Sequence, residues 1–248
     1  MTTPSFAPPC VAPVDVISTL QRQGYAVLNA SSVAALARCD LADLDALAQS
    51  WSDLPPDLYL KDGGRYRRRR HASCIVRGEE ILAVPHRAHW QPLEYNALHG
   101  GMERWFEPVA QPTVSLPAWN ALVRIATRVC SQLKGEQAWF VEMHQFRIDT
   151  TDGIGRPTPE GAHRDGVDLV AVFLVGRQGI KGGETRVFEA DGPNGQRFTL
   201  TEPWSLLLLD DERVIHESTP IQPLSGSGHR DTLVITVRAH GFQESAAA

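Results

Sequence analysis

The spacing of apolar residues divides this chain into a helical N-terminal part and a strand-rich C-terminal part. From Val14 to Trp51, apolar residues recur every three to five positions among alanine, aspartate and glutamine, a spacing that predicts amphipathic helices. The turn-like segment GYAVLNASS interrupts this region and predicts a short strand. A second helix is predicted from about Trp119 to Leu133, where Ala, Leu, Val and Ile alternate with basic residues.

After Gln137 the pattern changes to short apolar or alternating segments, separated by clusters of glycine, proline and aspartate. These segments predict strands. They are WFVEMHQFRI, VDLVAVFLV, TRVFEA, RFTL, SLLLLD, RVIHES and DTLVITVRA. A series of short strands favours an antiparallel β-sandwich or jelly roll, with the helices of the N-terminal half packed outside it. The expected fold class is therefore α+β, mainly β.

Length and composition indicate one globular domain. A chain of 248 residues is long enough for a well-buried core, and we expect a single domain over residues 14–242 after a flexible, proline-rich lead-in over residues 1–13. The apolar and charged fractions, 42% and 21%, are ordinary for a soluble protein. The lead-in does not resemble a signal peptide, and no run approaches the ~20 apolar residues of a membrane-spanning helix.

Charge and cysteine content narrow the choice of partners and compartment. The formal net charge of −5 gives no general attraction to nucleic acid or anionic lipid. We therefore expect a small-molecule substrate, with neither nucleic acid nor a membrane as partner, and a homodimer is compatible with the sequence. The four cysteines are scattered without a C-x-x-C pair, which argues against a disulfide scaffold and a cysteine zinc site. A reducing cytoplasm fits best.

A candidate metal site begins in EGAHRDGVDLVAVFL, where His163 and Asp165 are two positions apart before an apolar run. In a strand, residues two apart leave the same face. This spacing alone also fits a salt-bridged strand end. His216 follows 53 positions later in LLLLDDERVIHESTP. Two histidines and one carboxylate form the facial triad of non-haem Fe(II) oxygenases, which leaves coordination sites open for cosubstrate and O2; zinc in a hydrolase is the alternative.

A candidate anion site follows the second histidine. Arg230 lies fourteen positions after His216 in GHRDTLVITVRA, and Thr232 is two positions further on the same predicted strand face. A guanidinium binds a carboxylate through two parallel hydrogen bonds, and a neighbouring hydroxyl adds another. This pair predicts a site for the tail of a dicarboxylate. A hydrolase has no general need for it, so the oxygenase interpretation is favoured.

Together these motifs resemble the 2-oxoglutarate/Fe(II)-dependent dioxygenase superfamily. EGAHRDGVDLVAVFLV, the glycines of IKGGET, LLLLDDERVIHESTPI and GHRDTLVITV are similar to the bacterial branch that contains the L-isoleucine 4-hydroxylases and the biofilm-stress-and-motility proteins. The likeness extends upstream to YRRRRHA, QPLEYNALHGGMERWFEP and VEMHQFRI, and covers most of residues 65–240.

The resemblance implies a double-stranded β-helix, a cupin-like jelly roll, with flanking N-terminal helices. It implies Fe(II) held by His163, Asp165 and His216, with 2-oxoglutarate as cosubstrate and its far carboxylate on Arg230 and Thr232. O2 completes the reaction, which converts 2-oxoglutarate to succinate and hydroxylates a substrate. The cofactor carries the difficult chemistry, while the protein supplies ligands, orientation and a shielded pocket.

The basic run RYRRRRH, residues 65–71, has three interpretations. It is a solvated surface, a nucleic-acid patch, or a strand that sends alternate arginines into the mouth of the site to hold a substrate carboxylate. Related enzymes that repair alkylated bases carry a second arginine six positions after the first, whereas Thr236 stands there in this chain. We favour the third interpretation, with Arg68 and Arg70 as candidates.

Two further polar residues are candidates for substrate binding. In VEMHQFRI, Gln145 and Arg147 share one predicted strand face and would line the barrel, although an ordinary polar sheet surface explains them equally well. We expect the remaining histidines to be packed or exposed and not to bind a metal. They are His71, His86, His89, His99, His144, His229 and His240.

Two functions from different classes follow from the resemblance. The first is a hydroxylase acting on an unactivated carbon of a small molecule, with a free aliphatic L-amino acid such as isoleucine, leucine or methionine as the expected substrate. Its carboxylate requires a cation, and its aliphatic tail requires an apolar wall, which the segment from Trp90 to Phe106 would help to form. The second is a non-catalytic or regulatory β-helix protein that binds 2-oxoglutarate or a small ligand in a biofilm or stress response.

Overall fold

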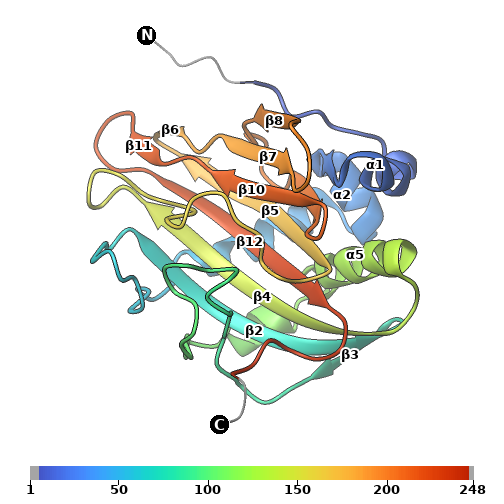
Figure 1. Cartoon of the computed structure of the whole chain (residues 1–248). Helices are drawn as coiled ribbons and strands as arrows, with labels where there is room; N and C mark the ends of the chain where they lie inside the picture. Colours follow the sequence, from blue (N-terminus) through green and yellow to red (C-terminus); the bar gives the residue numbers. More distant parts are fainter. Residues whose placement is uncertain (1–5, 246–248) are drawn as a thin grey trace.

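The computed structural model describes residues 6–245, so residues 1–5 of the expected lead-in lie outside the described part of the chain. A seven-stranded antiparallel sheet, in the order β1-β9-β5-β12-β4-β2-β3, forms the centre of the molecule. Helices cover one face of this sheet (Figure 1). A smaller sheet, β10-β7-β8, and the strand pair β11-β6 lie over the other face. The predicted α+β, mainly β fold is confirmed.

All the helices except α4 lie in the regions expected from the apolar spacing. They are α1 (Val16–Gln23), α2 (Ala30–Ala37), α3 (Leu41–Ala48), α4 (Gln111–Val114) and α5 (Pro117–Lys134), with 3-10 turns η1 (Pro13–Asp15) and η2 (Gln49–Trp51). A capping box begins α3, because the Asp40 side chain accepts from the Asp43 amide at 3.0 Å while the Asp43 side chain accepts from the Asp40 amide at 3.2 Å. In the described residues, no helix is long and apolar enough to cross a membrane.

The strands account for the C-terminal half of the chain and for part of the loop region before it. They are β1 (Tyr25–Leu28), β2 (Arg67–Arg77), β3 (Glu80–Ala83), β4 (Ala138–Asp149), β5 (Leu169–Gln178), β6 (Ile180–Gly182), β7 (Thr185–Glu189), β8 (Gly195–Phe198), β9 (Leu206–Asp210), β10 (Val214–Ser218), β11 (Ile221–Pro223) and β12 (His229–Arg238). The short strand predicted near GYAVLNASS is β1. Upstream of it, Val11 donates its amide to the Val27 carbonyl at 2.8 Å.

Two apolar cores lie on the two faces of the large sheet, and β9 contributes to both. Leu206 and Leu208 belong to the core between the sheet and the helices, whereas Leu207 and Leu209 belong to the core between the two sheets. Because side chains alternate across a strand, a strand buried on both faces requires a continuous apolar run. This explains why the sequence reads LLLLD, without polar alternation.

The register of three long strands sets the inner face of the large sheet. Arg67 of β2 and Arg230 of β12 both pair with Ile148 of β4, from opposite sides. In the next inward-facing row, Arg69 and Thr232 both pair with Phe146. Residues far apart in sequence are therefore laid side by side on one surface. That surface faces the smaller sheet (Figure 1).

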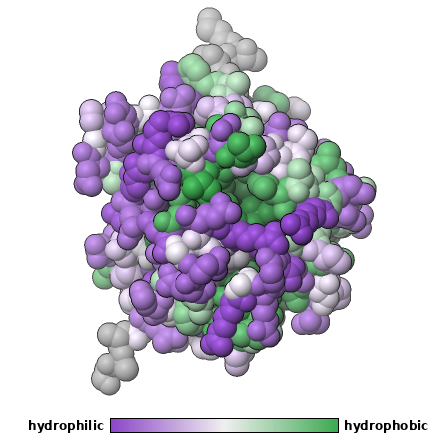
Figure 2. Space-filling view, turned by 90° about the vertical axis from the view of Figure 1, so that its right-hand side faces the viewer, coloured by the Kyte–Doolittle hydropathy of each residue, from purple (hydrophilic) through white to green (hydrophobic). Residues whose placement is uncertain are grey.

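The face of the molecule that carries α1 and α5 is partly apolar. Figure 2 shows apolar side chains gathered in a hollow there, framed by polar residues. On this side the helices line a cavity of about 140 Å³. The residues around it include Val16, Ile17, Leu36, Ile125 and Val129.

We expect Leu208→Ala to lower the free energy of unfolding by about 2–5 kcal/mol, because it removes buried methyl groups and leaves a cavity in the core beneath the helices. The Leu208 side chain is fully buried. The matched control is Leu58→Ala, at a leucine that is 87% exposed, which should change stability by less than about 0.5 kcal/mol. Urea denaturation of both variants measures this difference, and equal losses would contradict the assignment of the core.

Candidate active site

The three predicted metal ligands converge, although they come from two separate parts of the chain. His163 and Asp165 lie in the loop between β4 and β5, and His216 lies on β10 of the smaller sheet. Backbone hydrogen bonds of 3.0 and 3.1 Å join His163 to His216. Their Nε2 atoms each lie 3.8 Å from an Asp165 carboxylate oxygen. The potential ligand atoms of all three residues lie within 4.8 Å of one another.

The expected strand around His163 is corrected to a loop that forms a single bridge to β10. The convergence therefore does not come from strand alternation. It comes from the bridge and from the Asp211 side chain, which accepts backbone N–H groups from Asp165, Gly166 and Val167 at 2.7–3.1 Å. Asp211 is fully buried in the turn between β9 and β10. It fixes the loop to the strand that carries His216.

The two histidines differ in protonation, because their pKa values shift in opposite directions. His163 Nδ1 lies 2.9 Å from the Gly161 carbonyl; as a donor to this oxygen, Nδ1 keeps its proton, and the Nε2 atom faces Asp165. Burial, reinforced by the charge of His163, lowers the pKa of His216 to about 3. A neutral imidazole is the form that binds a metal ion. His216 is thus neutral at neutral pH. Burial lowers the pKa of His163, but the charges of Asp165 and Glu160 outweigh it and raise that pKa above the usual value, so a metal ion would displace a proton from this ring.

A second layer of side chains fixes the carboxylate of Asp165. Gln91 donates from Nε2 to Asp165 Oδ1 at 3.2 Å. The amide of Gln91 is itself oriented, because its Oε1 accepts from Arg104 at 2.9 Å and from Asn96 at 3.1 Å. Gln243 donates to the Asp165 backbone carbonyl at 3.0 Å. The sequence alone predicts no such role for these residues, since no spacing rule links them to the metal-binding motif.

The predicted anion site opens into the same pocket as the triad. Arg230 and Thr232 line this cavity of about 130 Å³ together with His163, Asp165 and His216. Arg230 is only 5% exposed, and it forms no ion pair with any residue in the described range 6–245. Burial, with a smaller contribution from Arg177, lowers the pKa of Arg230 to about 10, so it remains a cation. An unpaired buried cation favours a bound anion.

The structure corrects the expected placement of four candidate substrate-binding residues, Arg68, Arg70, Gln145 and Arg147. None of them lines the pocket. They leave β2 and β4 on the opposite, helix-facing side or at its edge. There the Arg68 Nε atom lies 3.6 Å from a carboxylate oxygen of Asp149, and Arg70 donates to the Pro108 carbonyl at 3.2 Å. Gln145 donates to the Ser50 hydroxyl at 2.8 Å. Arg147 donates to both carboxylate oxygens of Asp231, at 2.7 and 2.8 Å.

Arg67 and Arg69 take the inward positions instead, and both are buried in the pocket wall. The physical reason is the twofold alternation of a strand, which assigns Arg67 and Arg69 to one face and Arg68 and Arg70 to the other. In the uniform run RRRR, no apolar residue marks which face is buried. Alternate arginines of β2 do enter the pocket wall, but they are Arg67 and Arg69 and not the expected Arg68 and Arg70.

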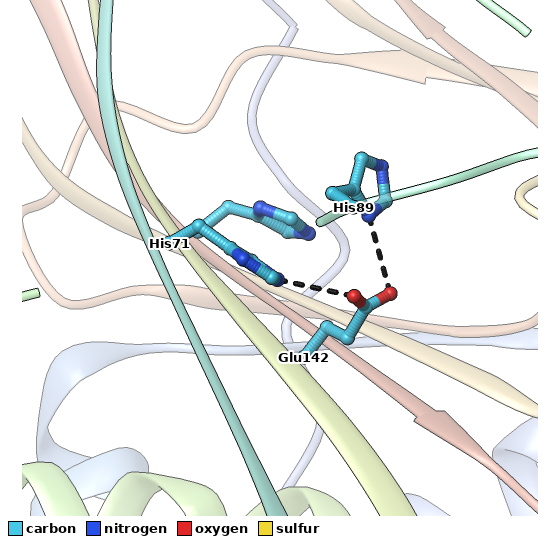
Figure 3. A group of neighbouring side chains, drawn as sticks. His71, His89 and Glu142 are labelled. Atoms are coloured by element: carbon cyan, nitrogen blue, oxygen red, sulfur yellow. Dashed lines mark hydrogen bonds and ion pairs between the residues drawn. The ribbon is translucent and has the colours of Figure 1, made fainter. Parts of the chain in front are cut away.

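Three histidines that we expected to be packed or exposed, without a metal, surround a buried carboxylate at one end of the pocket. His71 and His89 donate to the two oxygens of Glu142 at 3.1 and 3.2 Å (Figure 3). Burial opposes ionisation of Glu142, but the interactions with His89 and His71 hold its pKa well below the usual value. His144 completes a group with metal-binding geometry. However, Arg69 donates to His144 Nδ1 at 2.7 Å and so occupies the lone pair of a neutral ring.

Comparison with known proteins identifies the family. The model of the 2OG-Fe dioxygenase family matches residues 48–236. A crystal structure of a BsmA homolog from Methylobium petroleophilum PM1 is 51% identical, with 97% of this chain and 98% of that chain covered and a TM-score of 0.92. No curated protein matches the sequence.

Two more distant structures share the fold. IDO from Bacillus thuringiensis is 16% identical, with 94% of this chain and 100% of that chain covered and a TM-score of 0.75. The Fe(II)/α-ketoglutarate-dependent dioxygenase TqaL is 18% identical, with 91% and 86% covered and a TM-score of 0.69. The jelly-roll architecture predicted from the sequence is thereby confirmed. The specific isoleucine hydroxylase branch is not established by these comparisons.

The family uses Fe(II), 2-oxoglutarate and O2, and the pocket offers a matching set of groups. A cluster of two histidines and an aspartate lies in the same small cavity as a buried, unpaired arginine. The match of the family model extends over most of the chain and includes both parts of this cluster. This chain belongs to the 2OG-Fe dioxygenase family and is a 2-oxoglutarate/Fe(II)-dependent dioxygenase.

Proposed function

We propose that this dioxygenase hydroxylates an unactivated carbon of a small molecule, and that the molecule is a free aliphatic L-amino acid. The observation that carries the proposal is that His163, Asp165, His216 and Arg230 meet in one cavity of about 130 Å³. This volume favours a small substrate over a protein or nucleic-acid chain. The proposal assigns each side chain a separate task.

The residues present fit an Fe(II) ion. The separation of 3.8 Å between each Nε2 and the Asp165 oxygens is too long for a hydrogen bond, so His163, Asp165 and His216 face one another without bonding directly and would hold the ion between them. Two imidazoles and one carboxylate are the donor set that non-haem Fe(II) oxygenases use. When bound there, iron supplies the activation of O2 that is coupled to the oxidation of 2-oxoglutarate.

The protein's own groups orient the cosubstrate. Arg230 would bind the far carboxylate of 2-oxoglutarate through parallel hydrogen bonds, and the hydroxyl of Thr232, in the adjacent inward-facing row of β12, would add another. Both residues are at least 95% buried, so the contact excludes water and is little screened by salt. Orientation of the reacting groups in a dry cavity is the contribution that a protein makes to such chemistry.

The rest of the pocket suits a zwitterion with an aliphatic tail. Arg67 and Arg69 supply cationic donors for a carboxylate, and Glu142 supplies an anionic acceptor for an ammonium group. Val167, Val172, Val234 and other apolar side chains line the same cavity and would contact the tail. The presence of both charges within so small a volume supports an amino acid over a purely apolar substrate.

A regulatory role remains the second candidate, and the 51% identity to a structure named for a BsmA homolog favours its retention. A regulator would use Arg230 to bind 2-oxoglutarate without turnover. The two functions differ in one measurable property, which is the formation of succinate.

We expect His216→Ala to abolish iron binding and succinate formation, because Asp165 and one remaining imidazole do not fix the geometry of the ion. The measurement is the iron content of the folded protein, together with succinate produced from 2-oxoglutarate. The matched control is His240→Asn at an exposed histidine with φ 59°, a backbone conformation that asparagine tolerates. Full iron occupancy in His216→Ala would refute its assignment as a ligand.

Arg230→Ala should raise the apparent KM for 2-oxoglutarate by about tenfold or more, since loss of a charged hydrogen-bonded contact costs ~2 kcal/mol. Steady-state succinate formation at varied 2-oxoglutarate measures the change. The control is Arg65→Gln, at an arginine whose side chain is 79% exposed. If the KM of Arg230→Ala equalled that of the control in a folded protein, Arg230 would not bind the cosubstrate.

The substrate class is tested by incubating the iron-loaded enzyme with 2-oxoglutarate, O2 and each proteinogenic amino acid in turn. We expect isoleucine, leucine or methionine to stimulate succinate formation and to give a product heavier by one oxygen atom, measured by mass spectrometry. Succinate without stimulation by any amino acid would exclude this substrate class but keep the oxygenase. A complete absence of succinate from an enzyme that binds iron and 2-oxoglutarate would favour the regulator.

A further inference from the structure

Arg104 is a second buried arginine without a counter-ion in the pocket. Its side chain lies in the pocket wall and is 2% exposed. The guanidinium donates from Nη2 to Gln91 at 2.9 Å, its Nε has no hydrogen-bond partner, and Arg104 forms no ion pair with any residue between 6 and 245. Leaving a buried charge unpaired is costly. Among the described residues that line this pocket, the comparable arginine is Arg230, which we assign to 2-oxoglutarate.

Two neighbouring arginines add donors on the same side of the pocket. Arg67 and Arg69 share one carboxylate, that of Asp57, at 2.7 and 3.8 Å. This arrangement leaves Arg67 Nη2 and Arg69 Nε buried and without partners. The ring of Phe106 lies against Arg69, with its centroid 3.7 Å from the guanidinium carbon, and restricts its movement. The guanidinium groups of Arg67, Arg69 and Arg104 therefore lie in one cavity wall, and each has a nitrogen without a hydrogen-bond partner.

The other carboxylates of the pocket form no ion pair with Arg104, although Glu160 keeps one oxygen, Oε2, buried without a hydrogen-bond partner. Glu142 accepts from His71 and His89, and Glu160 lies 3.6 Å from His163 Nε2. Asp165 accepts from Gln91 and faces the two metal-binding histidines. None of them comes close enough to Arg104 to form an ion pair. No residue between 6 and 245 supplies a counter-ion for Arg104, which favours a bound anion in this role.

We propose that Arg104, together with Arg67 and Arg69, binds the carboxylate of the substrate, so that the pocket contains two separate carboxylate sites. The inference rests on the proposed function, which it deepens by naming the group that is recognised and the residues that recognise it. Arg67 and Arg230 pair with Ile148 from opposite sides in the register of the sheet. The substrate site is thus on the β2 side, and the 2-oxoglutarate site is on the β12 side.

The substrate site is connected to the metal ligand by one amide. Arg104 donates to Gln91 Oε1, and Gln91 donates from Nε2 to Asp165. A carboxylate held by Arg104 is therefore positioned relative to the same side chain that positions the iron. This linkage explains why an arginine suits position 104 better than a lysine. The planar guanidinium can donate to the substrate and to Gln91 at the same time.

The test is equilibrium binding, which requires no turnover. The anaerobic enzyme, loaded with Fe(II) and 2-oxoglutarate, is titrated in a calorimeter with isoleucine, leucine, methionine, 4-methylpentanoate and 3-methylbutylamine. The last two compounds retain the branched chain of leucine but keep only the carboxylate or only the amine. We expect binding of an amino acid and of 4-methylpentanoate, and at least about tenfold weaker binding of the amine.

Arg104→Gln should weaken binding of the carboxylates by about tenfold or more, and Arg104→Lys should restore part of it because the charge returns without the planar fork. The Kd for 2-oxoglutarate should stay within about twofold, since Arg230 is unchanged. Arg65→Gln is the matched control, and circular dichroism verifies the fold of each variant.

Several results would overturn the inference. One is unchanged binding of the amino acid by folded Arg104→Gln, and another is preference for the amine over 4-methylpentanoate. A failure of both the amino acids and 4-methylpentanoate to bind the wild type would also refute it. Carboxylate binding that depends on Arg104, without hydroxylation when O2 is admitted, would uphold the carboxylate site while refuting the proposed activity.

Discussion

The geometry of the active site depends on the hydrogen bonds that Asp211 accepts from three consecutive amides. Asp211 is not a candidate ligand, yet its buried carboxylate holds residues 165–167 against the turn that leads into β10. Hydrogen bonds to a charged acceptor are stronger than neutral ones, and breaking them would leave buried amides unpaired. This contact, with the bridge between His163 and His216, brings the two parts of the triad together.

The two faces of the large sheet have different tasks. The helix-facing side carries the main apolar core, in which Trp51, Trp119 and Trp139 are almost completely buried. The inner side holds charges at the cost of stability, because Arg104 and Arg230 are buried without ion-pair partners among the described residues. Functional sites commonly contain such buried, unpaired charges, and the rest of the fold must offset their unfavourable contribution to the free energy of folding. In this molecule the apolar core on the helix-facing side of the sheet supplies that stability.

Prediction from the sequence was most accurate where a periodic pattern was long. The helix expected from about Trp119 to Leu133 is α5 (Pro117–Lys134), and the run LLLLD is the doubly buried strand β9. Prediction was least accurate in the run RRRR, residues 67–70, where no apolar residue indicates which face of the strand is buried. Arg68 and Arg70 were expected inside, but Arg67 and Arg69 are there. A shift of one residue moves every side chain of a strand to the other face.

The sequence by itself determined the order and type of the main elements, the family, and the short motifs around His163, His216 and Arg230. These features are local, because periodicity and motif spacing are set by neighbouring residues. Only the tertiary structure revealed the contributions of Gln91, Arg104, Glu142 and Asp211, which occur in three separate segments. Their proximity depends on the path of the chain between strands, and no local pattern encodes that path. The chemistry of the metal site could therefore be predicted from local motifs, whereas the folding of distant segments decided which charges surround it.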